Sequence, residues 1–152
     1  MKHIPHFAAA TVAICLIATA AYAQSSNLRL RFHVPFAFSV QNTTFAPGEY
    51  EVTQPSTFIL ALRNVENQAS AFEHVQPTGS KKEADGRAIA VFHRYGGAYF
   101  LTTISNGSWQ STYDLERSNK EKMLTDKIPA RQPEVVRVLS NGTVVTADVG
   151  RE

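Results

Sequence analysis

Apolar and polar positions alternate along much of the chain. In residues 29–40, RLRFHVPFAFSV, every even-numbered position is apolar, and the odd-numbered positions are mostly polar or small. A period of two residues is typical of a β-strand with one buried face. Pro35 lies on the polar face and has no N–H group to donate, so it predicts an edge strand, a bulge or a break between two strands.

Similar alternation follows in the next segments. FAPGEYEV, residues 45–52, begins another strand, and TFILALRN and QASAFEHVQP are predicted to form a hairpin joined through residues 64–67. Residues 77–86, PTGSKKEADG, are polar and rich in turn-forming residues. They predict a loop between two halves of a sheet.

The clearest strand pattern surrounds two short turn sequences. Gly96-Gly97 and Asn106-Gly107 separate RAIAVFHRY, AYFLTTIS and SWQSTYDL. Both dipeptides favour two-residue hairpin loops, because both loop positions need a positive φ. Three consecutive antiparallel strands are therefore predicted.

Loops of two residues would fix the register of these strands. The predicted opposite pairs are Tyr95 with Ala98, Arg94 with Tyr99, His93 with Phe100, Val91 with Thr102, Ile104 with Trp109, and Phe100 with Tyr113. One face would then carry Ile89, Val91, His93, Phe100, Thr102, Ile104, Trp109, Ser111 and Tyr113. This face is the more aromatic, so it is predicted to face the core. A slip of one residue in either loop would exchange the two faces.

Four residues on this face are candidate ligand-binding residues: His93, Phe100, Trp109 and Tyr113. The row has two interpretations. His93 is either a buried imidazole that hydrogen-bonds a hydroxyl or the backbone and holds the register, or the polar end of a ligand pocket.

The opposite face places Arg94, Tyr99 and Asp114 in one row. An arginine in this position would stack on the tyrosine ring and pair with the carboxylate across it. The row is interpreted as a surface clamp.

A different pattern begins after the predicted strands. Ser118 and Glu121 have the spacing of a capping box, and NKEKMLTDK predicts a short helix. Residues 127–134 are interpreted as a linker, and residues 135–152 as a hairpin turning at Asn141-Gly142 or a frayed tail. Residues 24–126 would form an all-β domain, either a single antiparallel β-sandwich or a partly open β-barrel of about seven to ten strands, with one short helix near the C-terminal end.

The first 23 residues have the features of a cleaved signal peptide. Lys2 precedes an apolar run over residues 7–21, and Ala21-Tyr22-Ala23 matches a cleavage site. The run is shorter than the roughly 20 residues that span a bilayer. We therefore expect a periplasmic or secreted protein with no stable membrane span after cleavage.

Cleavage would change the chemistry of the chain. It would remove Cys15, the one cysteine, and Lys2, which reduces Lys and Arg from 15 to 14 against 13 Asp and Glu. The mature chain would then have no disulfide bond, and its near-zero charge would give no indication of nucleic-acid binding.

The sequence contains no motif that names a reaction. The histidines of the mature chain, His33, His74 and His93, lack the short spacing of zinc ligands, and neither H-E-x-x-H nor G-x-S-x-G is present. Nothing in the spacing of the carboxylates Glu49, Glu51, Glu73 and Asp114 favours glycoside hydrolysis. No catalytic residue, metal ligand or cofactor is predicted. A metal-binding protein or an enzyme that uses one of the three histidines is the weaker alternative.

Four segments of the chain resemble segments of a known group of proteins: VPFAFSV, FAPGEYEV, LRNV and VFHRYGGAYFL. Over about residues 29–122 the chain resembles small exported bacterial proteins of unknown function, in which the pattern is V-P-F-x-F-x-V, P-A-G-x-Y-x-V and F-x-R-Y-G-x-x-Y-F-L. The resemblance implies a β fold and secretion, and it implies no activity.

These features favour a non-catalytic binding or structural component of the bacterial cell envelope, with an envelope protein as its partner. The alternative is a carrier of a small apolar ligand, with His93 and Tyr113 at the polar end of an aromatic pocket. Aromatic side chains exposed in a row would instead indicate a carbohydrate platform. A long flat edge strand near Pro35 would indicate strand addition to a partner.

Overall fold

The computed structural model describes residues 28–78, 86–107, 112–127 and 132–147, so the predicted signal peptide lies outside the described residues. These residues form eleven strands and one helix, which confirms the predicted all-β class with slightly more strands than expected. The elements are β1 (Arg29–Val34), β2 (Phe38–Val40), β3 (Thr43–Phe45), β4 (Gly48–Ser56), β5 (Ile59–Asn64), β6 (Ser70–Thr78), β7 (Ile89–Tyr95), β8 (Ala98–Ser105), β9 (Thr112–Leu115), α2 (Asn119–Lys127), β10 (Glu134–Leu139) and β11 (Val144–Ala147).

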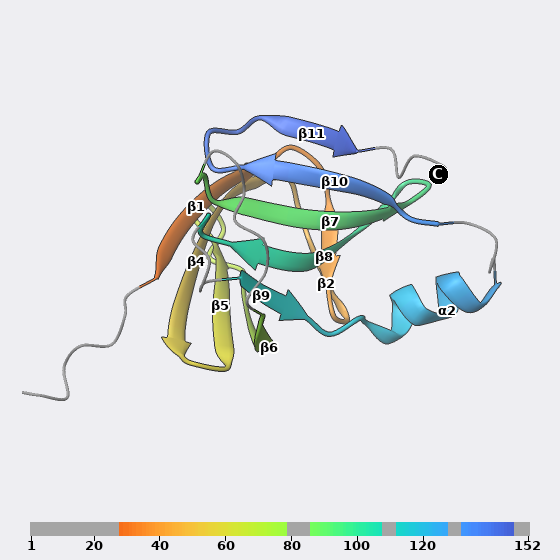
Figure 1. Ribbon diagram of the computed structural model, residues 1–152, viewed down its shortest axis with the longest axis horizontal. Helices are drawn as coiled ribbons and strands as arrows, with labels where there is room; N and C mark the ends of the chain where they lie inside the picture. Colours follow the sequence, from red (N-terminus) through yellow and green to blue (C-terminus); the bar gives the residue numbers. More distant parts are fainter. Residues whose placement is uncertain (1–27, 79–85, 108–111, 128–131, 148–152) are drawn as a thin grey trace, which may run out of the picture.

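The strands form one curled sheet in the order β1-β4-β5-β6-β9-β8-β7-β10-β11 (Figure 1). The pairs along this path are antiparallel, and β2 adds a short parallel bridge to β8. The curl brings β1 close to β10, although the hydrogen-bonded path ends at β1 on one side and β11 on the other. The fold is therefore a partly open barrel. The approach of β10 to the free side of β1 argues against strand addition at that edge.

Pro35 separates the first two strands. β1 ends at Val34 and β2 begins at Phe38. Of the three predicted possibilities, an edge strand, a bulge or a break between two strands, the structure has the break. The even-numbered residues Phe32, Val34, Phe38 and Val40 are all buried, as the alternation predicts.

The concave side of the sheet holds a filled aromatic and aliphatic core. Phe32, Tyr50, Phe92, Leu101 and Ile104 are among the residues buried there. Aromatic rings meet edge-on across the core, and the ring centroids of Phe38 and Tyr50, for example, are 5.0 Å apart. The space left among these side chains is about 10 Å³. A single water needs about that much room, so the core has no space there for a ligand.

The helix and the C-terminal hairpin are both present. The backbone N–H of Glu121 donates to Ser118 Oγ at 3.0 Å, which confirms Ser118 as the N-cap of α2. The Glu121 carboxylate contacts His93 and Tyr95, so it does not form the other half of the predicted capping box. β10 pairs with β7 and β11 pairs with β10, so residues 134–147 extend the sheet. Thr143 N donates to Asn141 Oδ1 at 3.1 Å in the turn between them.

The first predicted hairpin register is correct only near its loop. Tyr95 opposes Ala98 and His93 opposes Phe100, but the pairing then shifts and Val91 opposes Thr103. The predicted pair of Val91 with Thr102 is wrong, because a β-bulge places an extra residue in β8. The Thr102 hydroxyl donates to the Val91 carbonyl at 3.1 Å.

The second predicted register is wrong by four residues. Ile104 opposes Tyr113, so the predicted pairs of Ile104 with Trp109 and of Phe100 with Tyr113 do not form. Ser105 pairs with Thr112, and the connection is therefore longer than Asn106-Gly107. Gly107 has a φ of 81°, and a Cβ there would overlap the backbone of Gly86, so a close approach of two chain segments also requires this glycine.

The predicted core face is correct for Ile104 and Tyr113 but wrong for His93 and Phe100. The face of β7, β8 and β9 that joins the core carries Ala90, Phe92, Leu101, Ile104 and Tyr113. The bulge explains why Ile104 joins the core and Phe100 does not, because an extra residue in β8 reverses the faces beyond it. In β7, which has no extra residue, the even-numbered Ala90 and Phe92 face the core in place of the predicted odd-numbered residues. His93 and Phe100 therefore lie on the outer face of the sheet.

Candidate functional site

His93 contacts helix α2. Its Nδ1 lies 2.9 Å from Oε1 of Glu121, and the Tyr95 hydroxyl donates to the same oxygen at 3.3 Å. Glu121 is 1% exposed. We call these three residues the helix latch, because they join the first turn of α2 to the end of β7.

The helix latch has the features of a structural contact. A buried carboxylate is costly unless charged or hydrogen-bonding groups surround it, and here an imidazole and a phenol both contact it. Burial raises the pKa of Tyr95, and the neighbouring negative charge of Glu121 raises it further. Tyr95 therefore remains a neutral hydrogen-bond donor at physiological pH.

The other predicted ligand-binding residues do not join His93. Phe100 opposes it on the outer face, whereas Tyr113 lies on the core face and donates its hydroxyl to Gln54 Oε1 at 2.8 Å. Trp109 lies outside the described residues. The predicted row of His93, Phe100 and Tyr113 is wrong, because the connection between β8 and β9 is longer than two residues.

The predicted clamp forms in part. The Arg94 guanidinium lies 5.4 Å from the centroid of the Tyr99 ring, but its carboxylate partner is Glu134, at 3.1 Å. Asp114 accepts hydrogen bonds from the hydroxyls of Thr78 and Thr103 instead. The same register shift moves Asp114 away from the arginine.

The three histidines occupy different surroundings. His33 contacts Glu49, His74 stacks on Phe58, and His93 belongs to the helix latch. Among the described residues, no group of three or more His, Cys, Asp or Glu side chains could hold a metal ion. Within the same residues, no helix is long and apolar enough to cross a membrane.

A groove crosses the outer face of β1, β4, β5 and β6. Strand pairing aligns Arg29, Thr53, Ala61 and Phe72 in one transverse row. The two small residues lie in the middle, and the guanidinium and the phenyl ring lie at the two ends. The resulting hollow has a volume of about 420 Å³. We call it the outer groove.

The neighbouring row places a buried carboxylate beside the groove. Arg31, Glu51, Arg63 and Ser70 follow one another across the same four strands. Arg63 donates to Glu51 Oε2 at 2.6 Å, and Arg29 Nε lies 3.0 Å from Oε1. Three guanidinium groups therefore surround one carboxylate, since Arg31 is also within 3.9 Å.

The hydrogen bonds of Glu51 are incomplete. Its side chain is 4% exposed, and Oε1 accepts no hydrogen bond, because the nearby N–H of Arg29 is not directed at it. The hydrogen bond from Arg63 is the main reason that the pKa of Glu51 is lowered from its usual value, while burial acts in the opposite direction. Glu51 is thus an ionised acceptor, and its pKa does not suit a general acid.

Exposed apolar side chains lie in the groove and in the turn between β4 and β5. Phe72 is 71% exposed and forms one wall of the groove. Phe58 is 53% exposed and stacks on His74, with ring centroids 6.1 Å apart. Large apolar side chains so open to solvent, beside charged groups, commonly mark a binding surface.

The remaining carboxylates do not form a pair with Glu51. Glu73 opposes Leu60 on the other face of the sheet, and burial raises its pKa. Glu49 contacts His33 at 3.2 Å. Among the described residues that line the groove, Glu51 is the one carboxylate, whereas glycoside hydrolysis uses a facing pair.

The outer groove was not predicted from the sequence. Alternation correctly predicted that Arg29, Arg31 and His33 lie on the polar face of their strand. The missing information was the pairing order, which places β1 beside β4 and brings Glu51 between arginines from two other strands. Outward-facing Phe72, with Ser70 and His74 on the same side of its strand, was the available signal.

No protein-family model matches the chain, and no curated protein or solved structure matches it either. The resemblance to small exported bacterial proteins therefore stays a prediction. Inferences about function rest on the groove and on the residues around it.

Proposed function

We propose that this protein is an exported, non-catalytic binding component of the bacterial cell envelope, and that its ligand site is the outer groove. The observation that carries the proposal is the transverse row from Arg29 to Phe72, in which small side chains leave a hollow of about 420 Å³ between a cation and an aromatic wall. Polar groups that fix orientation, beside an apolar contact surface, are the usual composition of a ligand site.

The hollow on the surface is much larger than the space inside the core, which favours a surface binding site over a carrier with an interior cavity. A carrier for an apolar ligand needs an interior cavity, whereas the aromatic core leaves about 10 Å³ among its side chains. His93 and Tyr113, the expected polar end of such a cavity, lie on opposite faces of the sheet.

The exposure of the groove residues also favours binding. Phe72 is mostly exposed, so it contributes little to the core, and Arg29 is 68% exposed although it lies beside Glu51. Exposed arginines and aromatic residues are enriched at binding surfaces, where a partner buries them.

Expression of the full chain in a bacterial host tests export. We expect the protein in the periplasmic or secreted fraction, with the mass of residues 24–152. A protein that stays in the cytoplasm and keeps residues 1–23 would contradict export.

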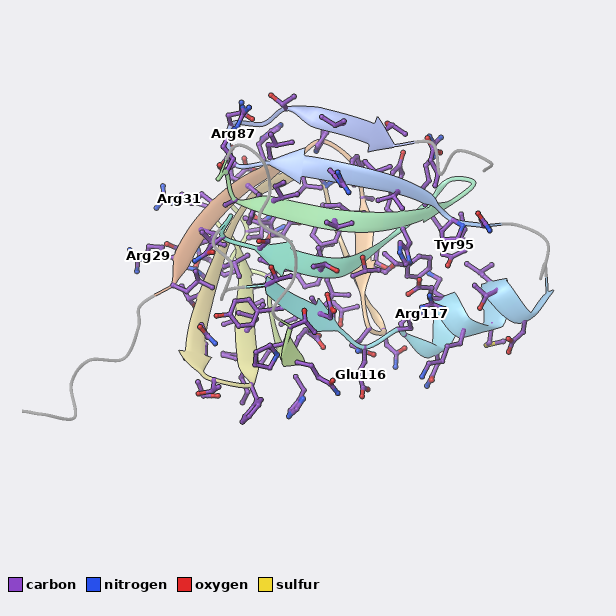
Figure 2. The ribbon with its side chains drawn as sticks, viewed as in Figure 1. Arg29, Arg31, Arg87, Tyr95, Glu116 and Arg117 are labelled. Atoms are coloured by element: carbon purple, nitrogen blue, oxygen red, sulfur yellow. The ribbon has the colours of Figure 1, made fainter. Side chains whose placement is uncertain are left out.

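The exported product then tests the groove. Purified protein is mixed with sacculi and membranes from the same host, and the sedimented fraction is measured. We expect Arg29→Gln combined with Phe72→Ala to abolish sedimentation. Arg117→Gln is the matched control, because it also removes one positive charge but lies beside α2, away from Arg29 and Arg31 (Figure 2). Equal sedimentation of the groove variant and wild type would contradict the proposed site.

A further inference from the structure

We infer that the outer groove binds an acidic carbohydrate, that is, hydroxylated sugar rings that carry carboxylates. This inference rests on the proposed function and names its ligand class. It is carried by three different groups that meet in one hollow: a cationic rim, an exposed aromatic wall and a buried acceptor that lacks a hydrogen bond.

The cationic rim calls for an anion. Arg29 and Arg63 line the hollow, and Arg31 lies next to them, within 3.9 Å of Glu51. The three arginines share the single carboxylate of Glu51, so the cluster carries more positive than negative charge. Each arginine side chain is at least half exposed, so its remaining N–H groups can reach a ligand. A planar guanidinium suits a carboxylate, which it binds through two parallel hydrogen bonds.

The aromatic wall calls for a ring with an apolar face. Phe72 stands across the strands from Arg29, with Thr53 and Ala61 between them. An aromatic ring has a negative face that attracts the polarised C–H groups on one side of a sugar ring. Three strand spacings of about 4.8 Å separate the ends of the row, which gives about 14 Å for more than one sugar ring.

The buried acceptor calls for hydroxyl groups. Glu51 Oε1 is buried and accepts no hydrogen bond, which costs free energy until a donor reaches it. The hydroxyls of Thr53 and Ser70 also line the groove. Arg29 covers Glu51 Oε1 but is 68% exposed, so a sugar hydroxyl that displaces its side chain can donate to that oxygen. A carboxylate on the same chain of sugars then binds the arginines. A simple anion would satisfy the arginines and leave Glu51 Oε1 without a hydrogen-bond donor, although Oε2 already accepts from Arg63.

Nuclear magnetic resonance titration of the exported product tests this inference. The probe is a linear oligosaccharide of three galacturonic acid units, and the control ligand is its methyl ester, which keeps the rings and removes the charges. We expect the acid to shift the backbone amide signals of Ala61, Ser70 and Phe72, and the ester to bind at least about tenfold more weakly. Equal binding of the acid and the ester would overturn the role of the arginines.

Variants separate the groove from other surfaces. Arg29→Gln and Phe72→Ala change exposed side chains, so both proteins should fold, and each should weaken binding of the trimer about tenfold or more. Arg117→Gln should bind as wild type does. The three amide signals should also shift less as salt concentration rises. Binding that persists in both groove variants would overturn the assignment.

Two further results distinguish this inference from the proposed function. If the trimer does not bind but phosphatidylglycerol vesicles do, and the groove variants abolish that binding, the ligand class is wrong and the groove remains a binding site. If neither probe binds and the groove variants still sediment with the envelope as wild type does, both the ligand class and the proposed site are overturned.

Discussion

Two buried glutamates lie at opposite ends of the molecule, and their surroundings differ. Glu51 and Glu121 are 3% and 1% exposed. Glu121 is enclosed by His93, Tyr95 and the first turn of α2. Glu51 lies beneath exposed arginines at the edge of an open groove, and one of its oxygens accepts no hydrogen bond.

The two carboxylates differ in how far their partners are exposed to solvent. In the helix latch, both partners of the carboxylate come from β7, and the His93 side chain is only 20% exposed. In the outer groove, the partners are long side chains whose charged ends face solvent. The arginines around Glu51 are therefore open to solvent, whereas the contacts of Glu121 join α2 to β7.

The largest expected effect is on the helix latch. Glu121→Ala would leave His93 and Tyr95 without their shared acceptor, and would remove the contact that holds α2 on the sheet. We expect the free energy of unfolding to fall by about 3 kcal/mol. Urea denaturation followed by circular dichroism measures it. A loss below about 0.5 kcal/mol would show that the latch is an ordinary surface contact.

A smaller effect is expected at the cap of the same helix. Ser118→Ala removes the acceptor of the Glu121 backbone N–H and should cost about 1 kcal/mol. The same denaturation measurement applies, and Ser118→Asp is the control that retains a capping oxygen. If alanine and aspartate gave equal stability, the hydroxyl would have no capping role.

Acid should affect Glu51 in a defined direction. Its pKa is lower in the folded protein than its usual value of 4.5, chiefly because Arg63 donates a hydrogen bond to it. A lowered folded-state pKa stabilises the protein above the unfolded-state pKa, and this contribution is lost as pH falls through the folded-state value. Melting temperatures measured from pH 7 down to pH 3 should therefore fall less steeply for Glu51→Gln than for wild type. Parallel curves would contradict the ion pairing.

The smallest expected effect on stability is at the groove wall. Phe72→Ala changes a side chain that is mostly exposed, so unfolding free energy should change by less than about 0.5 kcal/mol. Phe92→Ala is the matched control inside the core, with an expected loss of about 3 to 5 kcal/mol. Similar losses in the two variants would mean that Phe72 is part of the core.

The sequence predicted the strands and the helix better than it predicted which residues pair across the strands. Alternation around Pro35 and the capping box at Ser118 are local signals, and the strands and the helix that they predict are present. The β-bulge at Thr102 and the connection beginning at Asn106 are not encoded in the alternation. A single extra residue in β8 reverses the faces beyond it, so Phe100 and Ile104, which were predicted on one face, lie on opposite faces.

The same limit applies to the site. Arg29 and Phe72 are 43 positions apart in the chain, and only the order of the strands places them in one row. Likewise, Ser118 and Glu121 were recognised as a cap, but the contact of Glu121 with His93 depends on how α2 packs against the sheet. Side chains from distant strands become a site through pairing, and a pattern along one segment does not contain that information.

One pair of variants tests the contrast between the two regions most directly. The free energy of unfolding and the affinity for the galacturonic acid trimer would be measured for wild type, Ser118→Ala and Phe72→Ala. We predict that Ser118→Ala lowers stability by about 1 kcal/mol and keeps wild-type affinity, while Phe72→Ala keeps stability and weakens binding about tenfold or more. Wild-type affinity in Phe72→Ala, or equally weakened binding in both variants, would contradict the account.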